Sequence, residues 1–204
     1  LTQATVQQLH ALRLMGMVQA LDEQMRMSDI DRLGFEERLA LLLQREITVR
    51  DDRRLKRLLQ VAKLRLDACV EDIDFRAERG LDRGVLLRLA AGQWIRDADN
   101  VLIAGATGTG KSYLACALGH SACRQGLSTR YFRFSRLLQA MAIARADGSY
   151  PKLLERLAKT QLLILDDLGL ERGQVIYERR GPDEQPDAGQ VASGLAGQDE
   201  RNTG

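Results

Sequence analysis

Residues 105–112 read Gly105-Ala106-Thr107-Gly108-Thr109-Gly110-Lys111-Ser112 and fit the pattern G-x-x-x-x-G-K-[ST] at every fixed position. The apolar run 101–104 precedes this stretch, and the helix-like run 113–118 follows it. This order of strand, loop and helix is the setting in which such a loop holds nucleotide phosphates. The alternative is a tight glycine-rich turn without a ligand, and the flanking strand and helix argue against it.

The pattern, known as Walker A, predicts a role for each part of the loop. Its glycines let backbone N–H groups turn inward on a polyphosphate, and the start of the following helix adds partial positive charge. Lys111 is expected to reach the β- and γ-phosphates, and Ser112 to ligate Mg²⁺. We therefore predict a site for ATP and Mg²⁺. Its nucleotide contacts come from residues 105–113, namely Gly105, Ala106, Thr107, Gly108, Thr109, Gly110, Lys111, Ser112 and Tyr113.

A second motif, of the Walker B kind, follows at residues 162–167, which read Leu-Leu-Ile-Leu-Asp-Asp. The apolar run is too short for a helix and predicts a buried parallel strand with two acids at its carboxyl end. Ligands bind at that edge of an α/β sheet, so Asp166 is expected to hold Mg²⁺ directly or through water. Asp167 is expected to orient or deprotonate the attacking water. The candidate catalytic residues are Lys111, Asp166 and Asp167. A strand that ends in a solvated pair of acids is the alternative.

The bulk composition bounds the class of protein. The chain has 204 residues, 45% of them apolar, and its 30 Lys+Arg and 28 Asp+Glu give a net charge of +2. Any affinity for nucleic acid must therefore come from a local patch. No apolar stretch approaches the roughly 18 residues of a membrane span. We expect a cytoplasmic protein with no membrane partner, reduced cysteines and no cysteine metal site.

Residues 1–98 have apolar side chains at helical spacing and are expected to form an all-α domain, with one helix running from Phe35 to about Leu66. Between Arg45 and Arg65 this helix holds eight basic residues against three acids. The patch predicts contact with the DNA backbone and weak sequence preference. The alternative is a solvated helix face with i,i+4 ion pairs. The candidate DNA contacts are Arg50, Arg53, Arg54, Lys56 and Arg57.

From residue 100 the pattern alternates between strands and helices, which predicts the start of a doubly wound parallel sheet in an α/β fold. The expected strands are 100–104, 129–134 and 161–165, and the expected helices are 111–125, 135–146 and 149–159. We assign residues 99–180 to a partial ATPase core. Residues 181–204 are rich in Gly, Gln, Asp, Glu and Arg and are expected to be disordered.

Together these features resemble the IstB family of ATP-binding transposition helpers, which are related to DnaC-type helicase loaders within the AAA+ ATPases. The likeness covers roughly residues 1–170 and includes residues 12–17, 33–37, 73–75 and 94–95. The resemblance implies a P-loop NTPase of AAA+ type. It also implies assembly as a homo-oligomer on double-stranded DNA, through the N-terminal domain as well as the ATPase core, and action with a transposase. A helicase loader, or a nucleotide- or DNA-binding remnant without turnover, are the alternatives.

The chain departs from the family pattern after Leu170. An AAA+ core carries further strands there, with a polar sensor residue, an arginine finger and a helical lid, yet only about 35 residues remain. Residues 175–180 resemble the next helix of the family. Plausible codons for residues 189 onward spell a family-like string when read one nucleotide later. We therefore expect a frameshifted or truncated end, an incomplete sheet and little ATP hydrolysis.

Overall fold

The computed structural model describes residues 3–75, 81–167 and 175–177, and these form two compact units that divide between Arg57 and Leu58. The segment expected to be disordered, residues 181–204, lies outside the described residues. Within the described part, no helix is long and apolar enough to cross a membrane.

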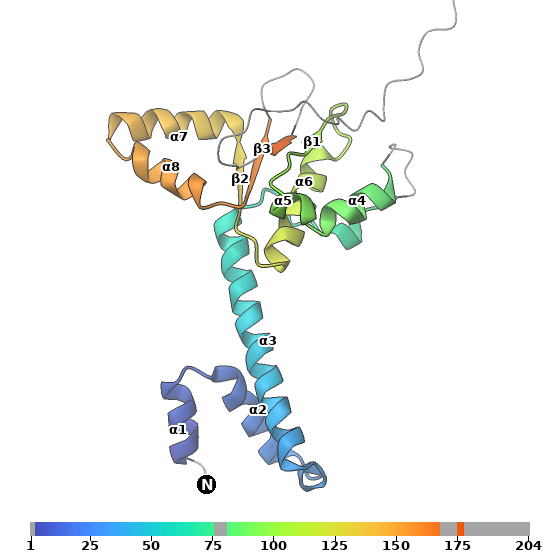
Figure 1. The fold of residues 1–204 in the computed structure, drawn as a ribbon, viewed down its shortest axis with the longest axis vertical. Coiled ribbons are helices and arrows are strands. Elements are labelled where there is room, and N and C mark those ends of the chain that lie inside the picture. The colour runs from blue at the N-terminus through green and yellow to red at the C-terminus, as the bar shows by residue number, and fades with distance from the viewer. Residues whose placement is uncertain (1–2, 76–80, 168–174, 178–204) are drawn as a thin grey trace, which may run out of the picture. The chain divides into compact units, whose positions relative to one another are not determined.

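The first unit is helical, as predicted (Figure 1). It contains α1 (Gln3–Ala11), α2 (Met15–Arg26), the short helix η1 (Ile30–Arg32) and most of α3 (Phe35–Ala62). Helix α3 begins at Phe35 as expected, where the Gly34 N–H donates to Glu37 Oε2 over 2.8 Å. It ends at Ala62 rather than near Leu66, because Lys63 takes a left-handed conformation with φ 51°.

Helices α2 and α3 meet at Gly16 and Glu46. A side chain at position 16 would come within 2.6 Å of the Glu46 Cα, so this approach requires glycine. The Glu46 carboxylate accepts hydrogen bonds from the N–H groups of Gly16 (2.7 Å) and Met17 (3.2 Å) and from Arg50 Nε (2.7 Å). Burial raises the pKa of Glu46, but these hydrogen bonds outweigh it and leave the pKa lowered. The ionised carboxylate therefore caps the positive end of α2.

The second unit contains a mixed α/β arrangement around a small sheet. Its strands within the described residues are β1 (Leu102–Ile103), β2 (Thr129–Arg133), β3 (Leu162–Asp166) and β4 (Val175–Tyr177), in the order β1-β4-β3-β2. Strands β2 and β3 are parallel, as predicted.

Strand β4 corrects two expectations. Residues 175–177 form a strand where the sequence led us to expect a helix, and this strand runs antiparallel to both β1 and β3, so the sheet is not wholly parallel. The residue types Val, Ile and Tyr favour a strand. The chain between Asp166 and Val175 is shorter than the dozen or more residues that a parallel crossover requires, so the return is antiparallel.

Helix α6 (Lys111–Arg124) packs on β2 and β3 and carries the core of this unit. Its buried face includes Cys116 and Cys123, which are free thiols, as expected. Gly119 lets the helix approach the sheet, because an added Cβ would lie 2.7 Å from Ile164 Cδ1. Helices α7 (Phe134–Ala146) and α8 (Tyr150–Ala158) pack together beside β2 (Figure 1).

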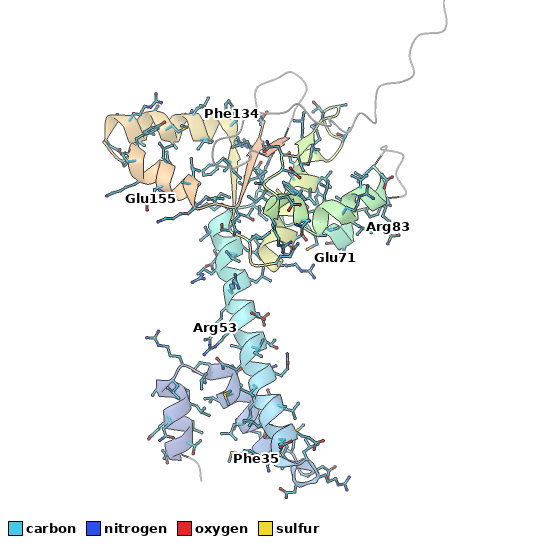
Figure 2. The ribbon with its side chains drawn as sticks, in the orientation of Figure 1. Phe35, Arg53, Glu71, Arg83, Phe134 and Glu155 are labelled. Carbon is cyan, nitrogen blue, oxygen red and sulfur yellow. The ribbon has the colours of Figure 1, made fainter. Side chains whose placement is uncertain are left out.

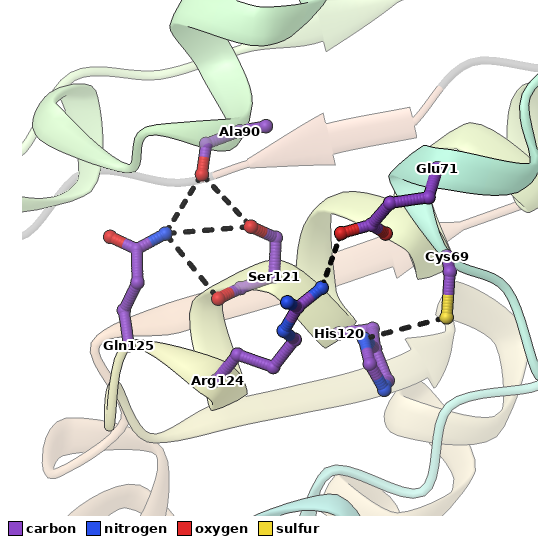
Figure 3. Close-up of polar contacts among 7 residues, drawn as sticks. All are labelled: Cys69, Glu71, Ala90, His120, Ser121, Arg124 and Gln125. Atoms are coloured by element: carbon purple, nitrogen blue, oxygen red, sulfur yellow. Dashed lines mark hydrogen bonds and ion pairs between the residues drawn. The ribbon is translucent and has the colours of Figure 1, made fainter.

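The segment before the sheet also packs on α6, through η2 (Val70–Asp72) and α4 (Arg83–Ala90). The short α5 (Gln93–Arg96) packs on α4, and its Arg96 donates a hydrogen bond to Gln125 at the end of α6. The Ala90 carbonyl accepts hydrogen bonds from Ser121 Oγ (2.9 Å) and Gln125 Nε2 (2.8 Å) (Figure 3). In the same view Arg124 pairs with Glu71. These contacts explain why the compact units divide after Arg57 and not at the domain boundary that we expected after residue 98.

Candidate nucleotide-binding site

The phosphate-loop candidate joins β1 to α6. Gly110 precedes the helix in a left-handed conformation with φ 89°, which glycine adopts without strain. No described side chain caps α6, and its first turn contains no acidic residue. The first N–H groups of an uncapped helix are donors without intrahelical partners and favour an anion. Residues 105–109 are exposed, so the loop is open to a ligand.

The loop is closed on itself through one carbonyl. Lys111 Nζ donates to the Ala106 carbonyl over 2.7 Å, and Thr109 Oγ1 donates to the same oxygen over 2.9 Å. Lys111 must give up this bond to reach a phosphate. The carbonyl keeps the Thr109 hydroxyl as a donor when it does so.

Ser112 joins the two sequence motifs. Its Oγ donates to Asp166 Oδ2 over 2.8 Å, although the two residues are 54 positions apart. The contact brings the start of α6 to the carboxyl end of β3, as the motifs predicted. Because the Ser112 proton points to Asp166, the lone pairs of its oxygen remain available for a cation.

Two further side chains contact Asp166 and were not foreseen. The Tyr131 hydroxyl donates to Asp166 Oδ2, and Arg65 NH1 lies 3.7 Å from the same oxygen. Burial and the neighbouring Asp166 raise the pKa of Tyr131 well above its ordinary value, so it stays protonated as a donor. With Ser112, these contacts all fall on Oδ2, and among the described residues none donates a hydrogen bond to Oδ1.

Asp167 and Tyr113 directly follow Asp166 and Ser112 in the chain, and their predicted roles stay predictions. Asp167 is exposed and has φ 62°, a conformation that few residues other than glycine adopt. Strained backbone of this kind is concentrated at functional sites. The Tyr113 side chain packs against the core, so any contact with a nucleotide would come from its backbone N–H.

The structure places the predicted DNA contacts on α3. Arg53, Arg54, Lys56 and Arg57 are exposed there, and Figure 2 labels Arg53 on the helix. Arg50 instead pairs with the buried Glu46, with its side chain 59% exposed. The contact with DNA stays a prediction.

Sequence analysis did not assign the contacts of Glu46, Tyr131 and Arg65, and the sequence signals for these three residues differ in strength. Glu46 lies on the same helix face as Leu39 and Leu42, and a charged residue on an apolar stripe indicates a buried partner. Tyr131 lies in a predicted strand but nothing marked its hydroxyl. Arg65 carried no signal, because its contact depends on the path of the chain after α3.

Comparison with known proteins gives a family of ATP-binding proteins, in agreement with the loop and carboxylate described above. The family model of IstB-like ATP binding proteins matches residues 7–174. The ATP-binding protein of insertion sequence IS1162 from Pseudomonas fluorescens is 53% identical over 171 residues, covering 83% of this chain and 74% of that protein. An insertion-sequence ATP-binding protein from Sinorhizobium fredii is 47% identical, covering 84% and 70%. One from Mycobacterium tuberculosis is 35% identical, covering 83% and 67%. The chain therefore belongs to the family of IstB-like ATP-binding proteins of insertion sequences.

Proposed function

We propose that this chain binds ATP with Mg²⁺ between the 105–112 loop and the end of β3, and that it serves as a helper of insertion-sequence transposition. The observation that supports the site most directly is the 2.8 Å hydrogen bond between Ser112 and Asp166. This bond joins the Ser112 hydroxyl and the Asp166 carboxylate, the two groups that the motifs predict to share Mg²⁺.

The residues present suit Mg²⁺, which prefers a few protein oxygens, water and substrate phosphates. Ser112 offers lone pairs, and Asp166 offers Oδ1 for a hydrogen bond from a bound water. Asp166 is 6% exposed, so its charge acts in a medium of low polarity. When bound, Mg²⁺ would neutralise charge on the phosphates.

The remaining residues receive roles from their positions. Lys111 would exchange the Ala106 carbonyl for phosphate oxygens. The first N–H groups of α6 would bind the phosphates that lie against the helix start. Asp167, which is exposed and next to Asp166, is our candidate for the residue that orients or deprotonates the attacking water in ATP hydrolysis.

The partners follow from the family and from charge. Curated relatives are described as insertion-sequence ATP-binding proteins, which supports a transposase as partner. Exposed bases on α3, at Arg53, Lys56 and Arg57, support double-stranded DNA as a second ligand. Assembly as a homo-oligomer is part of the same proposal.

Asp166→Asn tests the site. The variant keeps the shape of the side chain but loses its charge, so ATP affinity measured with Mg²⁺ should fall, while affinity measured in EDTA should stay close to wild type. Asp51→Asn is the matched control, because Asp51 is exposed on α3 in the first compact unit, whereas the loop belongs to the second. Equal loss with and without Mg²⁺ would mean that Asp166 is structural.

Two measurements test the wider role. ATP turnover with and without duplex DNA distinguishes a DNA-stimulated ATPase from a protein that only binds nucleotide. Co-purification with an insertion-sequence transposase, compared with a replicative helicase, distinguishes a transposition helper from a helicase loader.

A further inference from the structure

Among the described residues, Arg65 alone forms an ion pair with Asp166. The side chain of Asp166 is 8% exposed, whereas that of Arg65 is 44% exposed, so the guanidinium reaches from solvent to a buried carboxylate. An ionised carboxylate in such a place needs a counter-charge. Arg65 supplies it.

The backbone around Arg65 is held by α6. The turn at Lys63 ends α3, and Leu64 packs against the core with its Cδ2 close to Gly119 of α6. The segment is therefore anchored. The Arg65 side chain can change partner while its backbone stays in place.

Arg65 is also the most weakly held of the three groups on Oδ2. Its 3.7 Å separation exceeds hydrogen-bond length, whereas Ser112 and Tyr131 are within it. One carboxylate oxygen offers about two lone pairs, and two hydroxyls already occupy them. A divalent cation beside Ser112 and Asp166 would in addition repel the guanidinium.

We propose that Arg65 is a displaceable counter-ion of Asp166, which balances the carboxylate before nucleotide binds and gives up Oδ2 when Mg²⁺ and nucleotide bind. This inference rests on the nucleotide site proposed above. Arg65 acts as a positioning residue that competes with the cation. It thereby sets how strongly ATP binding depends on Mg²⁺.

The experiment compares the ATP dissociation constant in EDTA with that in Mg²⁺, using the full chain. In Arg65→Gln this ratio should rise by about three- to tenfold, because the carboxylate has lost its internal counter-charge. The melting temperature without ligand should fall by about 3 °C for the same reason. Arg65→Lys keeps a shorter cation and should give a ratio between those of wild type and Arg65→Gln.

Three further variants separate this role from a structural one. Arg136→Gln removes an exposed arginine on α7 that hydrogen-bonds to Gln139, and its ratio should equal wild type. Tyr131→Phe removes a neutral donor, so its ratio should not rise. In an Asp166→Asn background, Arg65→Gln should have no further effect on the ratio.

The result that overturns the inference is a ratio in Arg65→Gln equal to that of Arg136→Gln. Weaker ATP binding to an equal degree with and without Mg²⁺ would also overturn it, because Arg65 would then be a phosphate ligand. If Arg65→Gln does not fold, the ratio in Arg65→Lys decides, and a value no higher than wild type overturns the proposal. A wild-type chain that binds no ATP overturns the proposed function itself.

Discussion

Lys111→Ala tests whether the loop lysine exchanges its hydrogen bond to the loop for hydrogen bonds to nucleotide phosphates. In the structure Lys111 Nζ donates to the Ala106 carbonyl over 2.7 Å, and in a nucleotide complex it is expected to donate to the β- and γ-phosphates. Two hydrogen bonds to charged groups contribute about 3–6 kcal/mol, and giving up the carbonyl costs about 1.5 kcal/mol. The net loss is about 1.5–4.5 kcal/mol, so the dissociation constant should rise at least about tenfold.

Titration with a fluorescent ATP analogue measures this change. Circular dichroism should report unchanged helix content, because the Ala106 carbonyl keeps Thr109 as a donor and the site is exposed. Lys152→Ala, at an exposed position of α8, is the matched control. An affinity of Lys111→Ala within twofold of wild type, under conditions where wild type binds, would refute the assignment of the loop.

Three other outcomes are expected. Gly119→Ala should destabilise the second unit by about 1 kcal/mol in thermal unfolding, because crowding of the new methyl against Ile164 Cδ1 at 2.7 Å exceeds the gain in helix propensity, and a variant more stable than wild type would contradict the packing. Because the pKa of Glu46 is lowered in the folded protein, its contribution to stability is present above its unfolded-state pKa and is lost as pH falls through its folded-state pKa. The α-helix signal of Glu46→Gln should therefore decrease less on acidification than that of wild type. DNA affinity should fall steeply with increasing salt concentration. Replacing Arg53, Arg54 and Arg57 together by Gln should reduce the slope of this salt dependence. An unchanged slope would mean that these residues form a solvated helix face rather than a DNA contact.

Sequence reasoning succeeded where local signals determine structure. Helix α6 follows a loop motif with its own start signal, and β3 is a short apolar run that ends in acids, so their bounds and the contact between them were predictable. Strand β4 was not, because resemblance to a helix of other proteins outweighed its β-favouring residues and the short connection before it. The early division after Arg57 was also missed, since it depends on which surface the segment after α3 covers.

The joint between Gly16 and Glu46 has a consequence for how the first unit folds. Without Glu46 the amides of Gly16 and Met17 lie in an open first turn, where hydrogens exchange freely with solvent. The carboxylate that covers them comes from a residue 30 positions later, so α2 completes its first turn only once α3 has formed and docked. The helices should therefore open together as one cooperative unit, and slow amide exchange at Gly16 should report the stability of the whole α2–α3 pair rather than that of a single helix end.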